Sequence, residues 1–136
     1  DLLAAVLGAV ADEGAEPWVH SCAADTPLAL LRGAGARGLS VDLAQLSAAD
    51  HDPLAETLES GPSVALGIVS AVGEEPGSSD RLTEVAARWL EMVGLDPAEA
   101  GDRLVLTPSC GLAGAAPARA TRLLRDLRSA AAGLSG

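Results

Sequence analysis

The sequence predicts an α/β fold in which one helix is followed by four βα units, arranged as half of a (β/α)8 TIM barrel with parallel strands. Short apolar segments alternate with amphipathic segments of helical spacing, which is the pattern of parallel strands joined by helical crossovers. The chain has 136 residues, whereas a complete barrel has about 250. A small open α/β sheet fits the same alternation, so the candidate reactive residues decide between the two architectures.

The predicted elements form one unit over residues 1–136. Asp1 is a suitable cap for a first helix that runs to about Glu13, with apolar residues at helical spacing. The third of the four strands is nearly all apolar, as expected for a strand buried on both faces. The strands are predicted at about residues 17–22, 38–43, 63–70 and 103–108.

Helices are predicted after each strand. Thr26 is expected to cap the helix after the first strand, and Asp80 is expected to cap the most regular helix of the chain. Pro117 opens the terminal helix, in which Leu124 is expected to face inward. His51 is expected to be an exposed loop residue.

Composition and charge narrow the class of protein. The net charge of −10 argues against a nucleic-acid or anionic-membrane partner. No apolar run has the length of a membrane span, and no signal peptide is visible. Two cysteines suggest no disulfide framework, so we expect a reduced cytoplasmic protein. The absence of an initiator methionine and the start inside a helix predict a fragment of a longer protein.

A histidine and a cysteine two residues apart mark a candidate metal site. In a strand, residues i and i+2 point to the same face, so the side chains of His20 and Cys22 converge. Cys110 follows the fourth strand in a sharp turn, and the three side chains form a nitrogen and sulfur set suited to zinc. Asp42, at the end of the second strand, is the fourth candidate ligand. Two structural alternatives remain open: His20 and Cys22 as core residues, and Asp42 as a cap.

The positions of these residues favour the barrel. Cys22, Asp42 and Cys110 all lie at or just beyond the carboxyl ends of predicted strands. Active sites of (β/α)8 barrels are built at that end of the strands. We therefore expect four consecutive barrel units rather than an open sheet.

The same residues resemble those of a known family. His20-x-Cys22, a following strand that ends in an acidic residue, and residues 107–112 (Thr-Pro-Ser-Cys-Gly-Leu) resemble the C-terminal catalytic barrel of cobalamin-independent methionine synthase. The resemblance covers essentially the whole chain and is closest to short single-barrel relatives from high-GC bacteria. It implies the C-terminal (βα)4 half of a barrel shared with uroporphyrinogen decarboxylases, which lack the metal ligands. It also implies a zinc site formed by His20, Cys22, Asp42 and Cys110.

The resemblance further implies a methyltransferase. A zinc-bound thiol such as homocysteine would receive a methyl group to give methionine, in a reaction of the 5-methyltetrahydropteroyl- or corrinoid-dependent type. The methyl donor would be a folate or a methyl-corrinoid protein. Two departures from the family pattern bear on this: Asp42 stands where the long enzymes have Glu, and residues 70–72 (Ser-Ala-Val) stand where they have Asp-x-His.

Because the chain is predicted to form only half of the barrel, functions other than that of an active enzyme remain open. The family residues that hold homocysteine lie mostly on earlier strands, so we expect this chain to be inactive alone. Its open sheet edges predict pairing with the remaining half of the barrel or with a second copy. One alternative is a non-catalytic or catalytically incomplete metal-binding half-barrel, and another is a redox role for Cys22 and Cys110.

Overall fold

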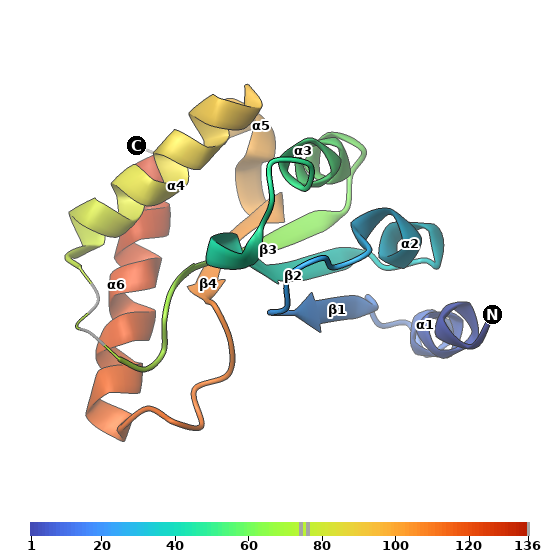
Figure 1. Cartoon of the computed structure of the whole chain (residues 1–136), viewed down its shortest axis with the longest axis horizontal. Coiled ribbons are helices and arrows are strands. Elements are labelled where there is room, and N and C mark those ends of the chain that lie inside the picture. Colours follow the sequence, from blue (N-terminus) through green and yellow to red (C-terminus); the bar gives the residue numbers. More distant parts are fainter. Residues whose placement is uncertain (74, 76, 136) are drawn as a thin grey trace.

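In a computed structural model of the chain, four parallel strands form one sheet in the order β1-β2-β3-β4 (Figure 1). The structure describes residues 1–73, 75 and 77–135. Consecutive strands are neighbours without a reversal of order, which is the arrangement within a barrel and differs from a doubly wound sheet. The predicted fold class is therefore confirmed. The strands are β1 (Trp18–Ser21), β2 (Gly38–Asp42), β3 (Ser63–Val69) and β4 (Leu104–Pro108).

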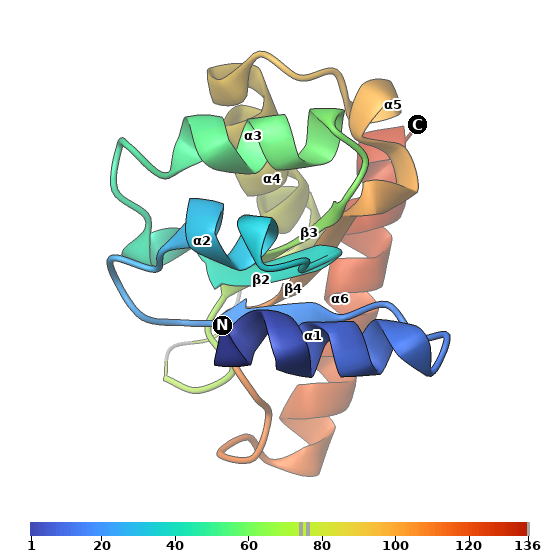
Figure 2. The ribbon, with the colours of Figure 1, turned by 90° about the vertical axis from the view of Figure 1, so that its right-hand side faces the viewer.

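Helices alternate with the strands. Helix α1 lies at the β1 end of the sheet, and α6 lies against β4 at the other end (Figure 2). Figure 2 shows α1 in front, beside β1, with α4 and α6 behind. No helix of the described residues is both long and apolar enough to traverse a lipid bilayer. The helices are α1 (Leu2–Asp12), α2 (Leu28–Gly33), α3 (His51–Glu59), α4 (Ser79–Val93), α5 (Pro97–Ala100) and α6 (Pro117–Ser135), with 3-10 turns η1 (Leu43–Gln45) and η2 (Gly101–Arg103).

The hydrophobic core lies between one face of the sheet and the helices. Leu39 and Val41 of β2 are buried in one cluster with Leu54, Leu58 and Leu90 of the helices. A second cluster joins α4, β4 and α6. Because strand residues alternate between faces, the residues between these leucines and valines point to the opposite face. That face carries the candidate metal site.

Two helices begin where the sequence did not place them. Ser78, and not Asp80, caps α4, since the Ser78 hydroxyl accepts a hydrogen bond from the Arg81 amide. Thr26 does not cap α2: its hydroxyl instead contacts Ser21 and donates to the Ala23 carbonyl. The Thr26 hydroxyl therefore organises the turn after β1, next to the candidate site.

The inward face of α6 differs from the prediction. Leu123 is fully buried and Leu127 is 3 % exposed, whereas Leu124 is 50 % exposed. Residues 123, 127 and 130 follow the helical repeat, and Leu124 lies about 100° away around the helix axis. The expected inward orientation of Leu124 is therefore wrong, and this side chain borders an open groove beside β4.

His51 is not an exposed loop residue. It is the first residue of α3 and is half-buried. Its Nδ1 accepts a hydrogen bond of 3.2 Å from the indole Nε1–H of Trp89, whose side chain is buried. A buried indole N–H needs an acceptor, so His51 has a structural role in joining α3 to α4.

Candidate metal centre

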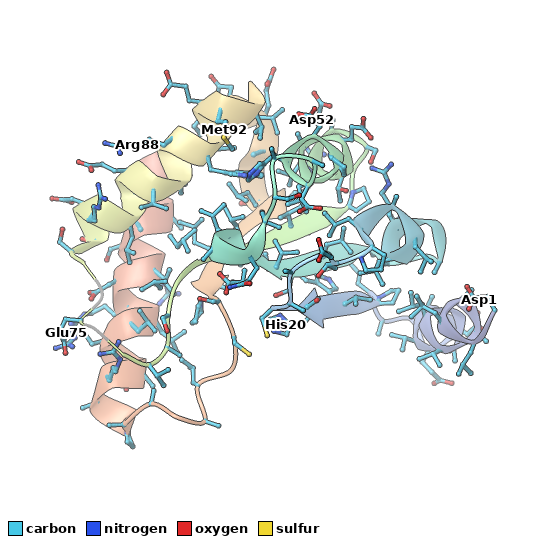
Figure 3. The ribbon with its side chains drawn as sticks, viewed as in Figure 1. Asp1, His20, Asp52, Glu75, Arg88 and Met92 are labelled. Carbon is cyan, nitrogen blue, oxygen red and sulfur yellow. The ribbon has the colours of Figure 1, made fainter. Side chains whose placement is uncertain are left out.

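Three side chains from the two edge strands meet at the carboxyl end of the sheet. His20 belongs to β1, Cys22 follows it, and Cys110 lies in the turn after β4. Their donor atoms all lie within 4.8 Å of one another, and the Cys22 thiol donates to Cys110 Sγ at 3.5 Å. Figure 3 shows His20 at this end of β1, with sulfur atoms beside it. The structure thus brings together three of the four predicted ligands.

His20 is positioned by the neighbouring strand. The β1–β2 register places His20 opposite Ser40, and both side chains lie on the face away from the helices. The imidazole Nδ1 and the Ser40 Oγ are 2.9 Å apart, which is a hydrogen bond. This contact occupies Nδ1, and Nε2 has no hydrogen-bond partner among the residues that the structure describes.

Cys22 is held by a hydrogen-bonded turn. Ser21 Oγ and Thr26 Oγ1 are 2.7 Å apart, and the Thr26 hydroxyl donates to the Ala23 carbonyl at 3.0 Å. Asp25, within this turn, has a positive φ of 55°, a conformation that Asp adopts more readily than most residues. The turn directs the chain back toward α2 and leaves the Cys22 thiol exposed at its start.

Cys110 is positioned by close packing of backbone against β3. The Ser109 amide and hydroxyl both donate to the Val69 carbonyl, at 2.9 and 3.1 Å. Gly67 permits this approach: a Cβ there would lie 2.6 Å from Ser109 Cα and 2.7 Å from the Val41 carbonyl oxygen. Only glycine fits between these two backbone segments.

The electrostatics and geometry of the site fit a divalent cation. The hydrogen bond with the Cys110 thiol, and after it the charge on that sulfur, raises the pKa of the Cys22 thiol above its ordinary value. The negative charge of Asp42 acts in the same direction. Two thiolates on one tetrahedral zinc lie roughly 3.8 Å apart, close to the separation of the two sulfur atoms here. Two thiols and an imidazole therefore suit zinc in both donor type and spacing.

Asp42 lies near this group but is not a member of it. Its Oδ1 accepts a hydrogen bond of 3.0 Å from the Ala44 amide and so caps η1. Asp42 lines a cavity of about 490 Å³ together with Cys22 and Cys110. As a zinc ligand, Asp42 stays a prediction.

A second cavity adjoins the site from the other side. It measures about 340 Å³ and is lined by His20, Ser40, Thr107 and Cys110, with apolar residues of the following turn. Thr107 Oγ1 is buried and has no hydrogen-bond partner among the described residues. Cys110 lines both cavities, so its thiol lies where the two spaces adjoin.

The residues that hold the candidate ligands in place cannot be recognised from sequence patterns alone. The alternation along β2 places Ser40 and Asp42 on one face, but only the register between strands identifies Ser40 as the partner of His20. The need for glycine at position 67 depends on where the turn after β4 lies. No pattern within a single segment reveals either contact.

Comparison with known proteins agrees with the family resemblance of the sequence. A family model described as the catalytic domain of the cobalamin-independent synthase matches residues 4–133, which include all four predicted ligands. Among curated proteins, none matches the chain.

Proposed function

The chain belongs to the family of cobalamin-independent synthase catalytic domains, whose activity is methyl transfer for methionine synthesis, and we propose that it forms the zinc-binding part of such a methyltransferase. The acceptor would be a thiol such as homocysteine. The convergence of His20, Cys22 and Cys110 within 4.8 Å is the observation that carries this proposal.

Each ligand residue has a distinct role in the proposal. A zinc ion supplies Lewis acidity that lowers the pKa of a thiol it binds, so that the thiol can act as a nucleophile at neutral pH. His20, Cys22 and Cys110 would be the permanent ligands. Asp42 would be the exchangeable fourth ligand, because a hard oxygen donor binds zinc less firmly than a thiolate and its carboxylate already has an alternative partner in the Ala44 amide.

The residues after β3 bear on the methyl donor. The Ser70 hydroxyl donates to the Val72 carbonyl at 2.6 Å, and residues 70–72 carry no acidic side chain. A folate leaving group needs protonation, which a neighbouring acid would supply. Of the two donors that the family resemblance implies, this segment favours a methyl-corrinoid protein over methyltetrahydrofolate.

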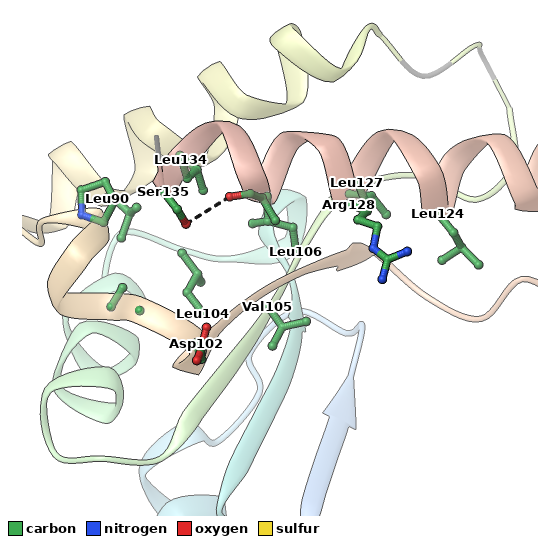
Figure 4. Close-up of a pocket in the computed structure, with 14 residues that line it drawn as sticks. Leu90, Asp102, Leu104, Val105, Leu106, Leu124, Leu127, Arg128, Leu134 and Ser135 are labelled. Carbon is green, nitrogen blue, oxygen red and sulfur yellow. Dashed lines mark hydrogen bonds between the residues drawn. The ribbon is translucent and has the colours of Figure 1, made fainter.

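The open edge of β4 is the proposed contact with four further βα units. Beside this edge, a groove of about 340 Å³ runs between β4 and α6 (Figure 4). Val105 and Leu124 expose apolar surface there, and an unpaired strand edge favours pairing with another strand. The further units would come from the rest of a longer polypeptide or from a second copy. A catalytically active monomer of 136 residues would contradict this part of the proposal.

Metal analysis of matched variants tests the proposed site. We expect the purified chain to hold one zinc ion, and we expect the His20→Ala and Cys110→Ala variants to lose it. His51→Ala is the matched control, because His51 is the only other histidine and contacts Trp89 rather than the thiols. Full retention of zinc in both ligand variants would refute the proposal.

A redox function of the thiol pair is the second candidate. The separation of 3.5 Å between the two sulfur atoms is short enough for a disulfide to form with a small movement of the chain. A disulfide in place of the metal in the purified protein would support this alternative. Zinc bound in a closed four-ligand site that accepts no thiol would instead indicate a non-catalytic metal-binding half-barrel.

A further inference from the structure

His20 differs from the two cysteines in how it is held. Hydrogen bonds to backbone carbonyls, from Thr26 to Ala23 and from Ser109 to Val69, hold the turns that carry Cys22 and Cys110. The imidazole of His20 is exposed, and the torsion about its Cβ–Cγ bond is intrinsically broad. Its one hydrogen bond among the described residues is the contact with Ser40. The orientation of His20 therefore depends on a single side chain from the neighbouring strand.

The Ser40 contact also bears on the proton of the imidazole. A neutral imidazole carries its proton on one nitrogen and an acceptor lone pair on the other. Ser40 Oγ lies 2.9 Å from Nδ1, so a proton on Nδ1 can be donated to the hydroxyl oxygen. The lone pair is then on Nε2, the nitrogen that Ser40 does not occupy. Metal-binding histidines generally have such a partner on the second nitrogen.

We propose that Ser40 is a positioning residue that holds His20 in the tautomer and orientation that present Nε2 to the thiol pair. This inference rests on the proposed zinc site. It assigns a function to the register of β1 against β2, because a shift of one residue would move the hydroxyl to the opposite face of the sheet.

Zinc affinity tests the proposal with matched variants. The full chain is titrated with zinc against a chromophoric chelator at neutral pH. Ser40→Ala is expected to bind zinc ~10–100-fold more weakly, whereas Ser40→Thr, which keeps a hydroxyl, is expected to restore most of the affinity. Ser63→Ala is the control, since Ser63 pairs with Gly38 at the far end of the sheet. Thermal unfolding of the metal-free variants shows whether each one folds.

A second measurement separates this inference from the zinc site itself. In the metal-free chain, nitrogen NMR of the neutral His20 ring is expected to show the proton on Nδ1, and Ser40→Ala is expected to shift it toward a mixture of tautomers. A proton on Nε2 in the wild type, or unchanged zinc affinity in Ser40→Ala, would overturn the role of Ser40. If the wild-type chain bound no zinc, the proposed function would fail, but the ring-nitrogen measurement would still decide whether Ser40 sets the tautomer.

Discussion

Substitution of Gly67 by alanine is predicted to damage the metal centre without altering any ligand. The added Cβ would lie 2.6 Å from Ser109 Cα, 2.7 Å from the Val41 carbonyl oxygen and 3.2 Å from the Pro108 carbonyl oxygen. Carbon atoms in favourable contact are at least ~3.5 Å apart, so the turn after β4 would have to move by about 0.9 Å. All three neighbours are backbone atoms, and no side-chain rotation can relieve the clash.

Movement of this turn is expected to affect both the free energy of unfolding and the binding of zinc. Overpacking of this kind destabilises a protein by about 1–3 kcal/mol. Cys110 directly follows Ser109, and metal sites require ligand distances within about 0.2 Å of their usual values. We therefore expect Gly67→Ala both to lower the free energy of unfolding and to weaken zinc binding.

Urea unfolding and zinc titration measure the two effects. Gly111→Ala is the matched control, because it makes the same substitution in the same turn, and no described residue other than its chain neighbours has an atom within 4 Å of the new Cβ. We expect this control to unfold and to bind zinc as the wild type does. The reasoning is refuted if Gly67→Ala also stays within about 0.5 kcal/mol of the wild type, the range of an ordinary surface substitution, and keeps its zinc affinity.

Three further predictions concern the scaffold. Ser78→Ala removes the cap of α4 and should lower the free energy of unfolding by about 1 kcal/mol in urea; no change would contradict the assigned cap. His51→Ala leaves the buried Trp89 indole N–H without its acceptor and should cost about 1–3 kcal/mol in the same assay, whereas an unchanged midpoint would argue against the contact. The hydrogen bond from the Ser47 hydroxyl, and then that from its amide, lowers the pKa of Asp50. Ionised Asp50 therefore stabilises the fold above about pH 4, and this contribution is lost as the pH falls through the lowered pKa. Asp50→Asn should remove that part of the pH dependence of unfolding, and identical pH profiles would exclude it.

The sequence was sufficient to predict the sheet and the convergence of three side chains that could hold a metal. The alternation of short apolar segments with amphipathic ones specifies parallel strands joined by helices. The spacing of His20 and Cys22 specifies a shared face because strand side chains alternate with a period of two. The position of Cys110 just after a strand was enough to place it at the same end of the sheet.

The remaining features depend on how separate segments lie against one another. The role of Ser40 depends on the register between β1 and β2, and the role of Gly67 depends on the approach of the turn that carries Ser109. Neither quantity is encoded in the periodicity of one segment. Leu124 was misplaced for a related reason: adjacent leucines in a helix compete for the same buried stripe, and packing decides which of them faces inward.

X-ray absorption spectroscopy of the zinc-loaded chain is the most direct test of the central claim. If His20, Cys22 and Cys110 hold the metal, the extended fine structure above the zinc edge will show two sulfur scatterers together with the outer-shell pattern of one imidazole. Cys110→Ala should then reduce the sulfur count to one or abolish binding. A zinc environment made only of oxygen and nitrogen donors would contradict the account.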